Sequence, residues 1–256
     1  SQACTKADQV VGIYIVTFKQ WEEHNDSPNK IAFWFRSLIE LQKDLHKLNI
    51  PLCILKCDTY DDCPQKILKF TSANEINNLY FNIEYPVNEL KRDEQVQAVL
   101  EKMGTSCFSF HDQVIHVPGS LKTKAGTNFS VYSPFKRCWL AELDYALLEE
   151  HAIPTIKQPV SVNQQDEYDL HSYKQSNINQ DLWPVGEESI QKTIVNFLDR
   201  KGSDYKTDRN FPGLTATSMM SPYINSGVVS SKWCLNQARA RNYDALDEGD
   251  KGLVHW

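Results

Sequence analysis

The chain has 256 residues, a formal net charge of −6 and an ordinary globular composition, with 41% hydrophobic and 23% charged residues. This length allows two domains, and the acidic total excludes bulk attraction to nucleic acid, so that any DNA contact has to be local. No apolar run reaches the length of a membrane span, and the seven cysteines form neither a C-x-x-C pair nor a zinc-type quartet. We therefore expect a soluble, cytoplasmic monomer with reduced thiols and no bound metal.

Predicted strands and helices alternate in the first part of the chain. After a short helix-like tail, residues 10–18 form a continuous apolar, β-branched run, which is typical of a strand buried on both faces in a parallel sheet. Further strands are expected at 51–57, 78–83 and 107–111. Helices are expected to begin near Pro28, Pro64 and Asn88, and one apolar stripe of the first of them should face the core: Trp34, Leu38, Leu41, Leu45 and Leu48. The alternation predicts an α/β doubly wound parallel sheet of the Rossmann type, although the sequence has no G-x-G-x-x-G or P-loop motif.

Polar residues follow two of these strands at the edge where such a sheet binds its ligands. Residues 20–25 come after the first strand, and Asn88-Glu89 come after the third. Ligands of doubly wound sheets bind beyond the carboxyl ends of the strands, so both segments are candidates for a binding site. Asn88-Glu89 also suits the capped start of the following helix, and the residues alone leave both interpretations open.

The second half of the chain changes character. Residues 158–180 are rich in Gln, Asn, Ser and Asp, and we interpret 116–182 as a linker between domains at 1–115 and 183–256, with short helices near 134–140 and 143–150. Beyond it the pattern predicts helices without strands: one from Glu187 to Lys201, a short one after Pro222, and a third capped by Ser230 or Ser231. The sequence therefore predicts an all-helical second domain.

The run from Thr217 to Pro222 has the composition of an anion cradle. Thr217, Ser218 and Ser221 place hydroxyl groups beside backbone N–H groups, and Ser221 followed by Pro222 suits the cap and first residue of a helix. A helix N-terminus attracts phosphate, so a phosphorylated cofactor is one candidate ligand. An ordinary helix cap is the alternative.

Spaced motifs run through the whole chain. They are Gln20-Trp21 with His24 and Ser27-Pro28; Tyr85-x-x-Asn88-Glu89 with Arg92-Asp93; Val131-Tyr132-Ser133-Pro134-Phe135-Lys136; Trp183-Pro184-x-Gly186-Glu187; and Arg209-Asn210-Phe211-Pro212 before Thr217-Ser218-x-x-Ser221-Pro222-Tyr223. In this order the sequence resembles the photolyase/cryptochrome family, in particular the bacterial class I cyclobutane pyrimidine dimer photolyases of the folate-antenna type.

The resemblance implies light-driven repair of pyrimidine dimers in DNA. In that reaction reduced FAD, excited directly or through a 5,10-methenyltetrahydrofolate antenna, donates an electron to a flipped-out dimer. The cofactor carries the chemistry, so we expect no catalytic side chain in this chain. A cryptochrome-type blue-light receptor on the same scaffold is one alternative, and a folded but inactive fragment is another.

The resemblance also assigns roles to individual residues. It implies that FAD is contacted by Tyr205, Thr217, Ser218, Met219, Met220, Ser221 and Trp256. It places His24, Asn88 and Glu89 in the folate pocket, and Arg209 on the DNA backbone. Without it, Tyr205 and Trp256 would be interpreted as core residues and Arg209 as an ordinary surface arginine. Neighbouring cations that could extend a basic face are Lys122, Lys124, Lys136 and Arg137.

The sequence departs from the family in three places. Family members often have Gly-Thr-Ser-Arg-Leu-Ser where this chain has residues 216–221, so Met219 replaces a cation near the cofactor phosphates. The usual first-strand signature, of the type W-F-R-x-D-L-R, is absent, and family members continue beyond Trp256. We therefore expect a fragment that lacks the first strand, carries only the start of the FAD-binding domain, and holds flavin weakly or not at all.

Overall fold

The chain folds into two compact units. The computed structural model describes residues 2–163, 168–173, 179 and 181–256. Ser1–Phe110 and Ala152–Gly186 form an α/β unit, and His111–His151 and Glu187–Trp256 form a helical unit. The segment that we interpreted as a linker is thus divided between the units, with its first part in the helical unit and its second part in the α/β unit.

The strands of the α/β unit run parallel, as predicted. Among the described residues they are β1 (Gly12–Thr17), β2 (Leu52–Cys57), β3 (Asn78–Asn82) and β4 (Ser106–Phe110). In the first pair Gly12 lies opposite Leu52 and Thr17 opposite Cys57. Backbone hydrogen bonds join β1 to β2 and β3 to β4, so the described strands form two parallel pairs. Parallel strands alternating with helices confirm the α/β fold class.

Helices connect these strands. They are α1 (Gln2–Lys6), α2 (Phe18–Glu23), α3 (Pro28–Lys47), α4 (Cys63–Ala73) and α5 (Val87–Lys102), with short 3-10 helices η1 (Tyr60–Asp62) and η3 (Leu170–Ser172). The predicted start of α3 is confirmed, because Pro28 is its first residue and the Ser27 hydroxyl accepts a hydrogen bond from the Lys30 N–H at 3.2 Å. α5 begins at Val87 after Pro86, so Asn88 lies inside the helix and does not cap it.

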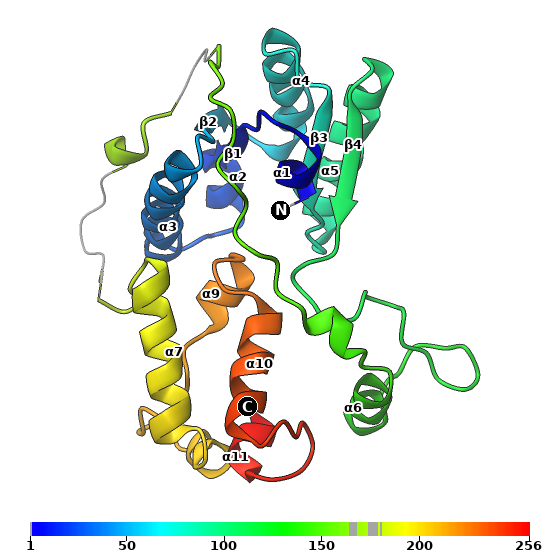
Figure 1. Ribbon diagram of the computed structural model, residues 1–256, viewed down its shortest axis with the longest axis vertical. Helices are drawn as coiled ribbons and strands as arrows, with labels where there is room; N and C mark the ends of the chain where they lie inside the picture. Colours follow the sequence, from blue (N-terminus) through cyan, green and yellow to red (C-terminus); the bar gives the residue numbers. More distant parts are fainter. Residues whose placement is uncertain (1, 164–167, 174–178, 180) are drawn as a thin grey trace. The chain divides into compact units, whose positions relative to one another are not determined.

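Helices cover both faces of the first strand pair (Figure 1). Val16 and Ile54 pack with α2 and α3, whereas Ile13, Ile15 and Cys57 pack with α4 and α5. This alternation follows from the two-residue period of a strand, which sends neighbouring side chains to opposite faces. It is the arrangement of a doubly wound fold, and it leaves the carboxyl ends of the strands free to carry a site.

The buried face of α3 is rotated from the predicted stripe. Ile31, Phe35 and Leu38 are at most 9% exposed, whereas Leu41 is 45% exposed. Leu38 of the predicted stripe lies in the core, and Trp34 and Leu45 pack against it, but Leu41 lies outside the packed core. The prediction that Leu41 is a core residue is therefore wrong.

Residues 168–173 belong to the core of the α/β unit. Leu170 is 4% exposed, and the Tyr173 ring stacks on Phe35 with 4.5 Å between centroids. The Tyr168 N–H donates to the Ile54 carbonyl oxygen at 2.9 Å. The prediction of a surface linker at 158–180 is wrong for this stretch, because its apolar side chains pack although its neighbours are polar. Residues 158–163 of that stretch contain no helix or strand, whereas residues 164–167, 174–178 and 180 lie outside the described residues.

The helical unit contains no strand among its described residues, as predicted. Its elements are α6 (Tyr132–Ala141), η2 (Tyr145–Leu148), α7 (Glu187–Lys201), α8 (Tyr205–Asp208), α9 (Ser221–Asn225), α10 (Ser231–Arg241) and α11 (Lys251–His255). Ser230 caps α10, with its hydroxyl accepting from the Lys232 N–H at 3.2 Å. Ser221 is not a cap, because Met220 takes that position with helical dihedral angles and Ser221 already begins α9.

Two glycines let α11 approach the end of α7. A Cβ on Gly252 would lie 2.1 Å from the Gly202 carbonyl oxygen and 2.2 Å from that of Ser203. The helix is fixed at its start by Asp250, whose side chain accepts from the Gly252 and Leu253 N–H groups at 2.8 and 3.0 Å. This contact determines where the last residues of the chain lie.

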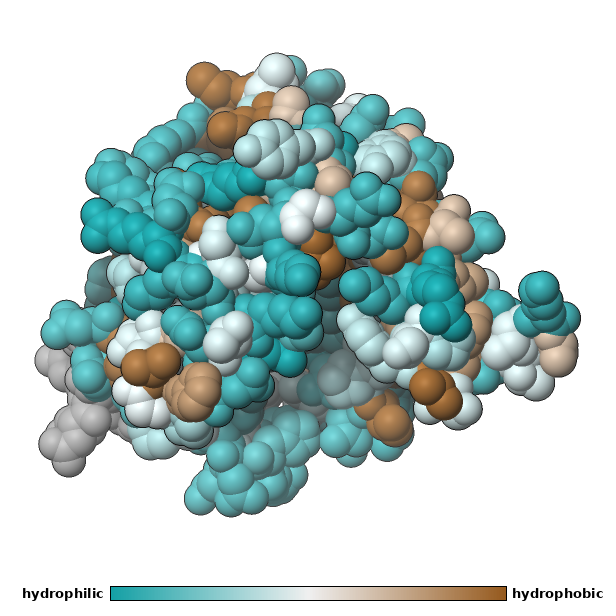
Figure 2. All heavy atoms as spheres, turned by 90° about the horizontal axis from the view of Figure 1, so that it is seen from below, coloured by the Kyte–Doolittle hydropathy of each residue, from teal (hydrophilic) through white to brown (hydrophobic). Residues whose placement is uncertain are grey.

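The surface shows no gathered apolar area in the view of Figure 2, where hydrophilic residues predominate and apolar ones lie in small separate groups. None of the helices among the described residues combines the length and apolar character needed to cross a membrane.

Candidate functional site

Three segments of the α/β unit meet beyond the carboxyl ends of the strands. His24 follows α2, Asn88 and Glu89 lie in the first turn of α5, and the Asn88 Nδ2 is 3.2 Å from the His24 Nε2. Gln20 and Tyr60 join them: the Gln20 Nε2 is 3.0 Å from the His24 Nε2, and the Tyr60 hydroxyl donates to the Glu89 Oε1 at 3.2 Å. We call these five residues the polar cluster. The structure thus brings together all three residues predicted for the folate pocket.

The hydrogen bonds of the cluster fix the tautomer of His24. The Tyr60 N–H donates to the Gln20 Oε1 at 3.1 Å, which turns the Gln20 NH₂ group toward the imidazole. Asn88 presents a second NH₂ group to the same nitrogen. The His24 Nε2 must therefore be the acceptor, and the ring proton lies on Nδ1.

Arg92 packs against the polar cluster and pairs with carboxylates outside it. Its guanidinium carbon lies 5.0 Å from the centroid of the Tyr60 ring, and its Nη2 donates to Glu84 at 2.8 Å and to Asp93 at 2.7 Å. Burial alone would lower the pKa of Arg92, but the hydrogen bond to Glu84 and the charges of Asp93 and Glu84 raise it. The arginine is thus fully engaged, which leaves the Glu89 carboxylate to other partners.

Tyr60 is a neutral donor in this environment. Burial and then the negative charge of Glu89 raise the pKa of its phenol. Across the part of the chain that the structure describes, no ion pair reaches Glu89. The carboxylate therefore keeps its charge available for a ligand that offers N–H groups, while the Asn88 amide offers both a donor and an acceptor.

Sequence reasoning missed Gln20 and Tyr60 as site residues. Gln20 lies within the polar segment after β1 that the sequence singles out, and Tyr60 stands three residues beyond the end of β2. The position of Tyr60 could have been used to predict its role, because the carboxyl ends of neighbouring parallel strands share one edge of the sheet.

The helical unit assembles part of the set predicted for FAD. The Trp256 indole N–H donates to the Ser218 hydroxyl at 3.1 Å. The buried ring of Phe197, which sequence reasoning assigned to the apolar face of its helix and not to the site, lies 6.0 Å from the Trp256 ring and 5.8 Å from the Tyr205 ring. Tyr205 and Trp256 thus pack against Phe197, and Ser218 joins them through Trp256, although these residues are distant in sequence.

The rest of the predicted set is divided between surface and core. Thr217 and Ser221 are exposed, and Met219 is 43% exposed at a turn with a φ of 52°. Met220 is 5% exposed, so its side chain belongs to the core. α9 has five residues and no side-chain cap, so it supplies little of the aligned dipole on which the predicted phosphate cradle depends.

Arg209 belongs to a group of cations. Its guanidinium carbon lies 5.6 Å from the Tyr205 ring centroid, and the His255 ring lies 6.3 Å from the same tyrosine. Burial lowers the pKa of His255, and the charges of Arg209, Lys206 and Lys136 lower it further. α6, α8 and α11 therefore contribute positive or protonatable groups to one area of the helical unit, which we call the basic area.

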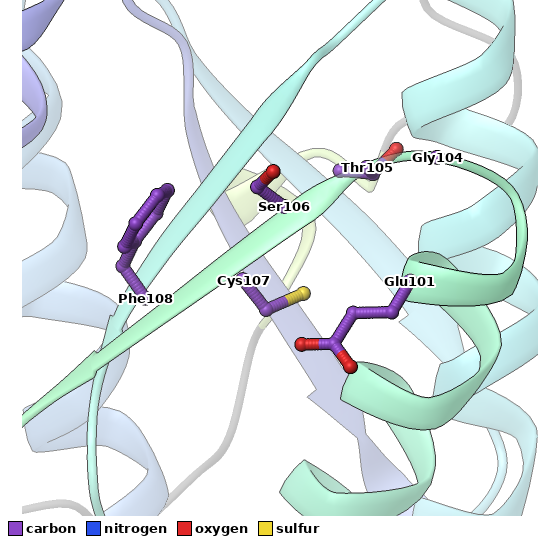
Figure 3. A pocket seen from close by; sticks show the side chains of 6 residues that line it. All are labelled: Glu101, Gly104, Thr105, Ser106, Cys107 and Phe108. Atoms are coloured by element: carbon purple, nitrogen blue, oxygen red, sulfur yellow. The ribbon is translucent and has the colours of Figure 1, made fainter.

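A separate pocket lies at the amino end of β4 (Figure 3). It has a volume of about 380 Å³ and is lined by Glu101 and residues 104–108. Cys107 and Glu101 lie on one side of the strand and Phe108 on the other. Burial and then the charge of Glu101 raise the pKa of the Cys107 thiol, which makes it a poor nucleophile. The described residues contain no group of three or more metal-ligating side chains.

Comparison with known proteins identifies the family. The family model described as DNA photolyase matches residues 1–158. Curated relatives named deoxyribodipyrimidine photo-lyase include one from Buchnera aphidicola, 33% identical over 91% of this chain and 48% of its own length. Another, from Escherichia coli, is 29% identical over 96% of this chain and 52% of its own length. The chain spans about half the length of these relatives.

Solved structures share the fold. A bacterial class III photolyase from Agrobacterium tumefaciens superposes with a TM-score of 0.73 at 21% identity, covering 94% of this chain and 50% of its own. A cryptochrome from Synechocystis superposes with a TM-score of 0.79 at 14% identity, covering 96% of this chain and 52% of its own. At such identities these likenesses show the fold alone. Because the family model matches more than half of its residues, the chain belongs to the DNA photolyase family.

Proposed function

We propose that the protein is a deoxyribodipyrimidine photo-lyase, a light-driven enzyme that repairs cyclobutane pyrimidine dimers in DNA. The curated relatives with this name support the activity. The polar cluster is the observation that supports a folate antenna site, because it assembles hydrogen-bonding groups beyond the carboxyl ends of the strands. There it is suited to a folate antenna of the 5,10-methenyltetrahydrofolate type.

The polar cluster fits the pterin end of a folate. The Glu89 carboxylate can accept the adjacent N–H groups of a 2-amino-4-oxopterin, and the Asn88 amide can pair with a neighbouring donor and acceptor. His24 carries its proton on Nδ1, so it can serve as a further donor. When bound, the folate supplies light absorption, and these side chains supply its orientation.

The helical unit contributes to an FAD site. Ser218 and Trp256 are joined by a hydrogen bond, and Tyr205 packs beside them through Phe197. Thr217 and Ser221, in the same segment as Ser218, have exposed side chains. Their hydroxyls can bind the cofactor's phosphates together with backbone N–H groups. When bound and reduced, FAD supplies the electron that splits the dimer, so no side chain has to act as an acid, base or nucleophile.

The basic area around Arg209 is suited to the DNA backbone. Arg209 is exposed, and its planar guanidinium can grip a phosphate through two hydrogen bonds. Lys136 and Lys206 add charge beside it, which explains how a chain with a net charge of −6 can still bind DNA locally. A monomeric state and a cytoplasmic location remain predictions.

The deciding experiment is repair of a defined lesion. The full-length protein is incubated with an oligonucleotide that contains one cyclobutane dimer, in blue light or in the dark, and dimer loss is measured by chromatography. We expect restoration in light only. An absence of light-dependent restoration in protein with reduced flavin would instead support the cryptochrome alternative, for which the present support is a likeness of fold at 14% identity.

A further inference from the structure

One residue connects the two halves of the polar cluster. Tyr60 stands at the start of η1, directly beyond β2. Its backbone N–H donates to Gln20, which orients the His24 imidazole, and its hydroxyl donates to the Glu89 carboxylate. The Tyr60 and His24 rings meet edge to face with 6.1 Å between centroids. Every recognition group of the cluster therefore depends on Tyr60 directly or through one neighbour.

We propose that Tyr60 is a positioning residue that sets the Glu89 carboxylate for a ligand with two adjacent N–H donors. The inference rests on the proposed antenna site and adds to it a residue and a basis for ligand selection. Glu89 lies in the first turn of α5, where its side chain could adopt several rotamers. The Tyr60 hydroxyl donates to Oε1 at 3.2 Å and thereby restricts the orientation of the carboxylate.

The position of Tyr60 is itself well fixed. Its backbone bonds Gln20 at 3.1 Å, and the Arg92 guanidinium covers its ring at 5.0 Å. Arg92 is held by Glu84 and Asp93, so it does not compete for Glu89. A hydroxyl held in this way presents a fixed donor, and the carboxylate that accepts it is preorganised before a ligand arrives.

This geometry selects between two kinds of heteroaromatic edge. A 2-amino-4-oxopteridine offers an amino group beside a ring N–H, which matches a carboxylate with two acceptor oxygens. A 2,4-dioxopteridine replaces the amino group with a carbonyl oxygen, which a carboxylate repels. A carboxylate that is correctly oriented discriminates strongly between the two, and one that rotates freely does so weakly.

The test compares pterin with lumazine, which carry these two edges. Both are titrated by fluorescence against the full-length protein and its Tyr60→Phe variant, which keeps the ring and the backbone N–H. We expect Tyr60→Phe to weaken pterin binding about fivefold to tenfold and to leave lumazine binding unchanged, so that the dissociation constant of pterin rises relative to that of lumazine. Tyr80→Phe is the matched control, because Tyr80 lies on β3 and its ring stacks on Phe108 outside the cluster.

A double-mutant cycle separates positioning from general stability. In a Glu89→Gln background, Tyr60→Phe should cause no further change in the ratio of the pterin dissociation constant to that of lumazine, because the charge that Tyr60 positions is gone. An unchanged ratio in Tyr60→Phe alone would overturn the inference while leaving the antenna site in place. Tighter pterin binding in that variant would also overturn it, since Tyr60 would then be a competitor. If the unaltered protein binds no pterin, the proposed antenna site and this inference both fail.

Discussion

The two units build their candidate sites in different ways. In the α/β unit, the polar cluster is a hydrogen-bonded network of side chains from three segments, all supported by one edge of the parallel strands. In the helical unit, Tyr205 and Trp256 from the set predicted for FAD pack against the ring of Phe197, and the Trp256 indole donates a hydrogen bond to Ser218. The first site is therefore set by directional bonds, and the second by how closely helices approach. We expect the two to respond to different kinds of substitution.

The largest effect should come from breaking the helix contact in the helical unit. Gly252→Ala places a methyl group against backbone carbonyl oxygens that cannot rotate away. We expect a loss of about 3 kcal/mol in the free energy of unfolding, measured by urea denaturation followed by circular dichroism. Gly213→Ala is the control, since no atom lies within 4 Å of a Cβ built there. Equal stability of the two variants would show that α11 does not depend on this contact.

In the α/β unit the corresponding change removes a charge and keeps the packing. Glu89→Gln retains the shape of the side chain but loses the anionic acceptor, so we expect folate affinity to fall by about 2 kcal/mol. Flavin-only repair should be unaffected. Glu94→Gln, at an exposed position of the same helix, controls for the lost charge. The folate content of the purified protein is measured by absorbance, and an unchanged content would remove Glu89 from the site.

How much of this could be predicted from the sequence differs between the units. Strands with continuous apolar, β-branched runs and helices with marked starts were predictable, and so were the candidate residues at the edge of the sheet, because parallel topology brings those ends together. The hydrogen-bond partners within the polar cluster could not be predicted from the sequence. Tyr60 follows its strand without any motif, and only its distances to Gln20 and Glu89 show its place.

In the helical unit the sequence was less informative for a physical reason. Ser221-Pro222 has the composition of a capped helix start, but the turn at Met219 starts the helix one residue earlier and removes the cap. Leu170 lies in a polar stretch yet is buried against the α/β core. The burial of Leu170 depends on tertiary contacts, which override local preference.

The basic area would use a third kind of interaction, between exposed cations of the helical unit and the phosphates of DNA. Arg209→Gln should weaken binding to oligonucleotides of every sequence and reduce the slope of log affinity against log salt by about 1. Arg200→Gln, in the last turn of α7, is the matched control. Affinities are measured by fluorescence anisotropy over a salt series. A slope that does not differ from that of the control would place the DNA contact elsewhere.

The smallest expected effect concerns the strand beneath the polar cluster. Burial, followed by the charge of Glu84, raises the pKa of the Tyr14 phenol, which also lies near Arg92 and Asp26. The unfolded chain releases this proton above a pH of about 10, whereas the folded α/β unit retains it. Stability from this group is therefore fully present below that pH and is lost as the pH rises further, by at most about 1.4 kcal/mol per pH unit. Tyr14→Phe removes the titrating group, so its free energy of unfolding, measured by urea denaturation from pH 8 to pH 11, should decline less steeply than that of the unaltered protein. Parallel curves would show that alkaline sensitivity arises outside this strand.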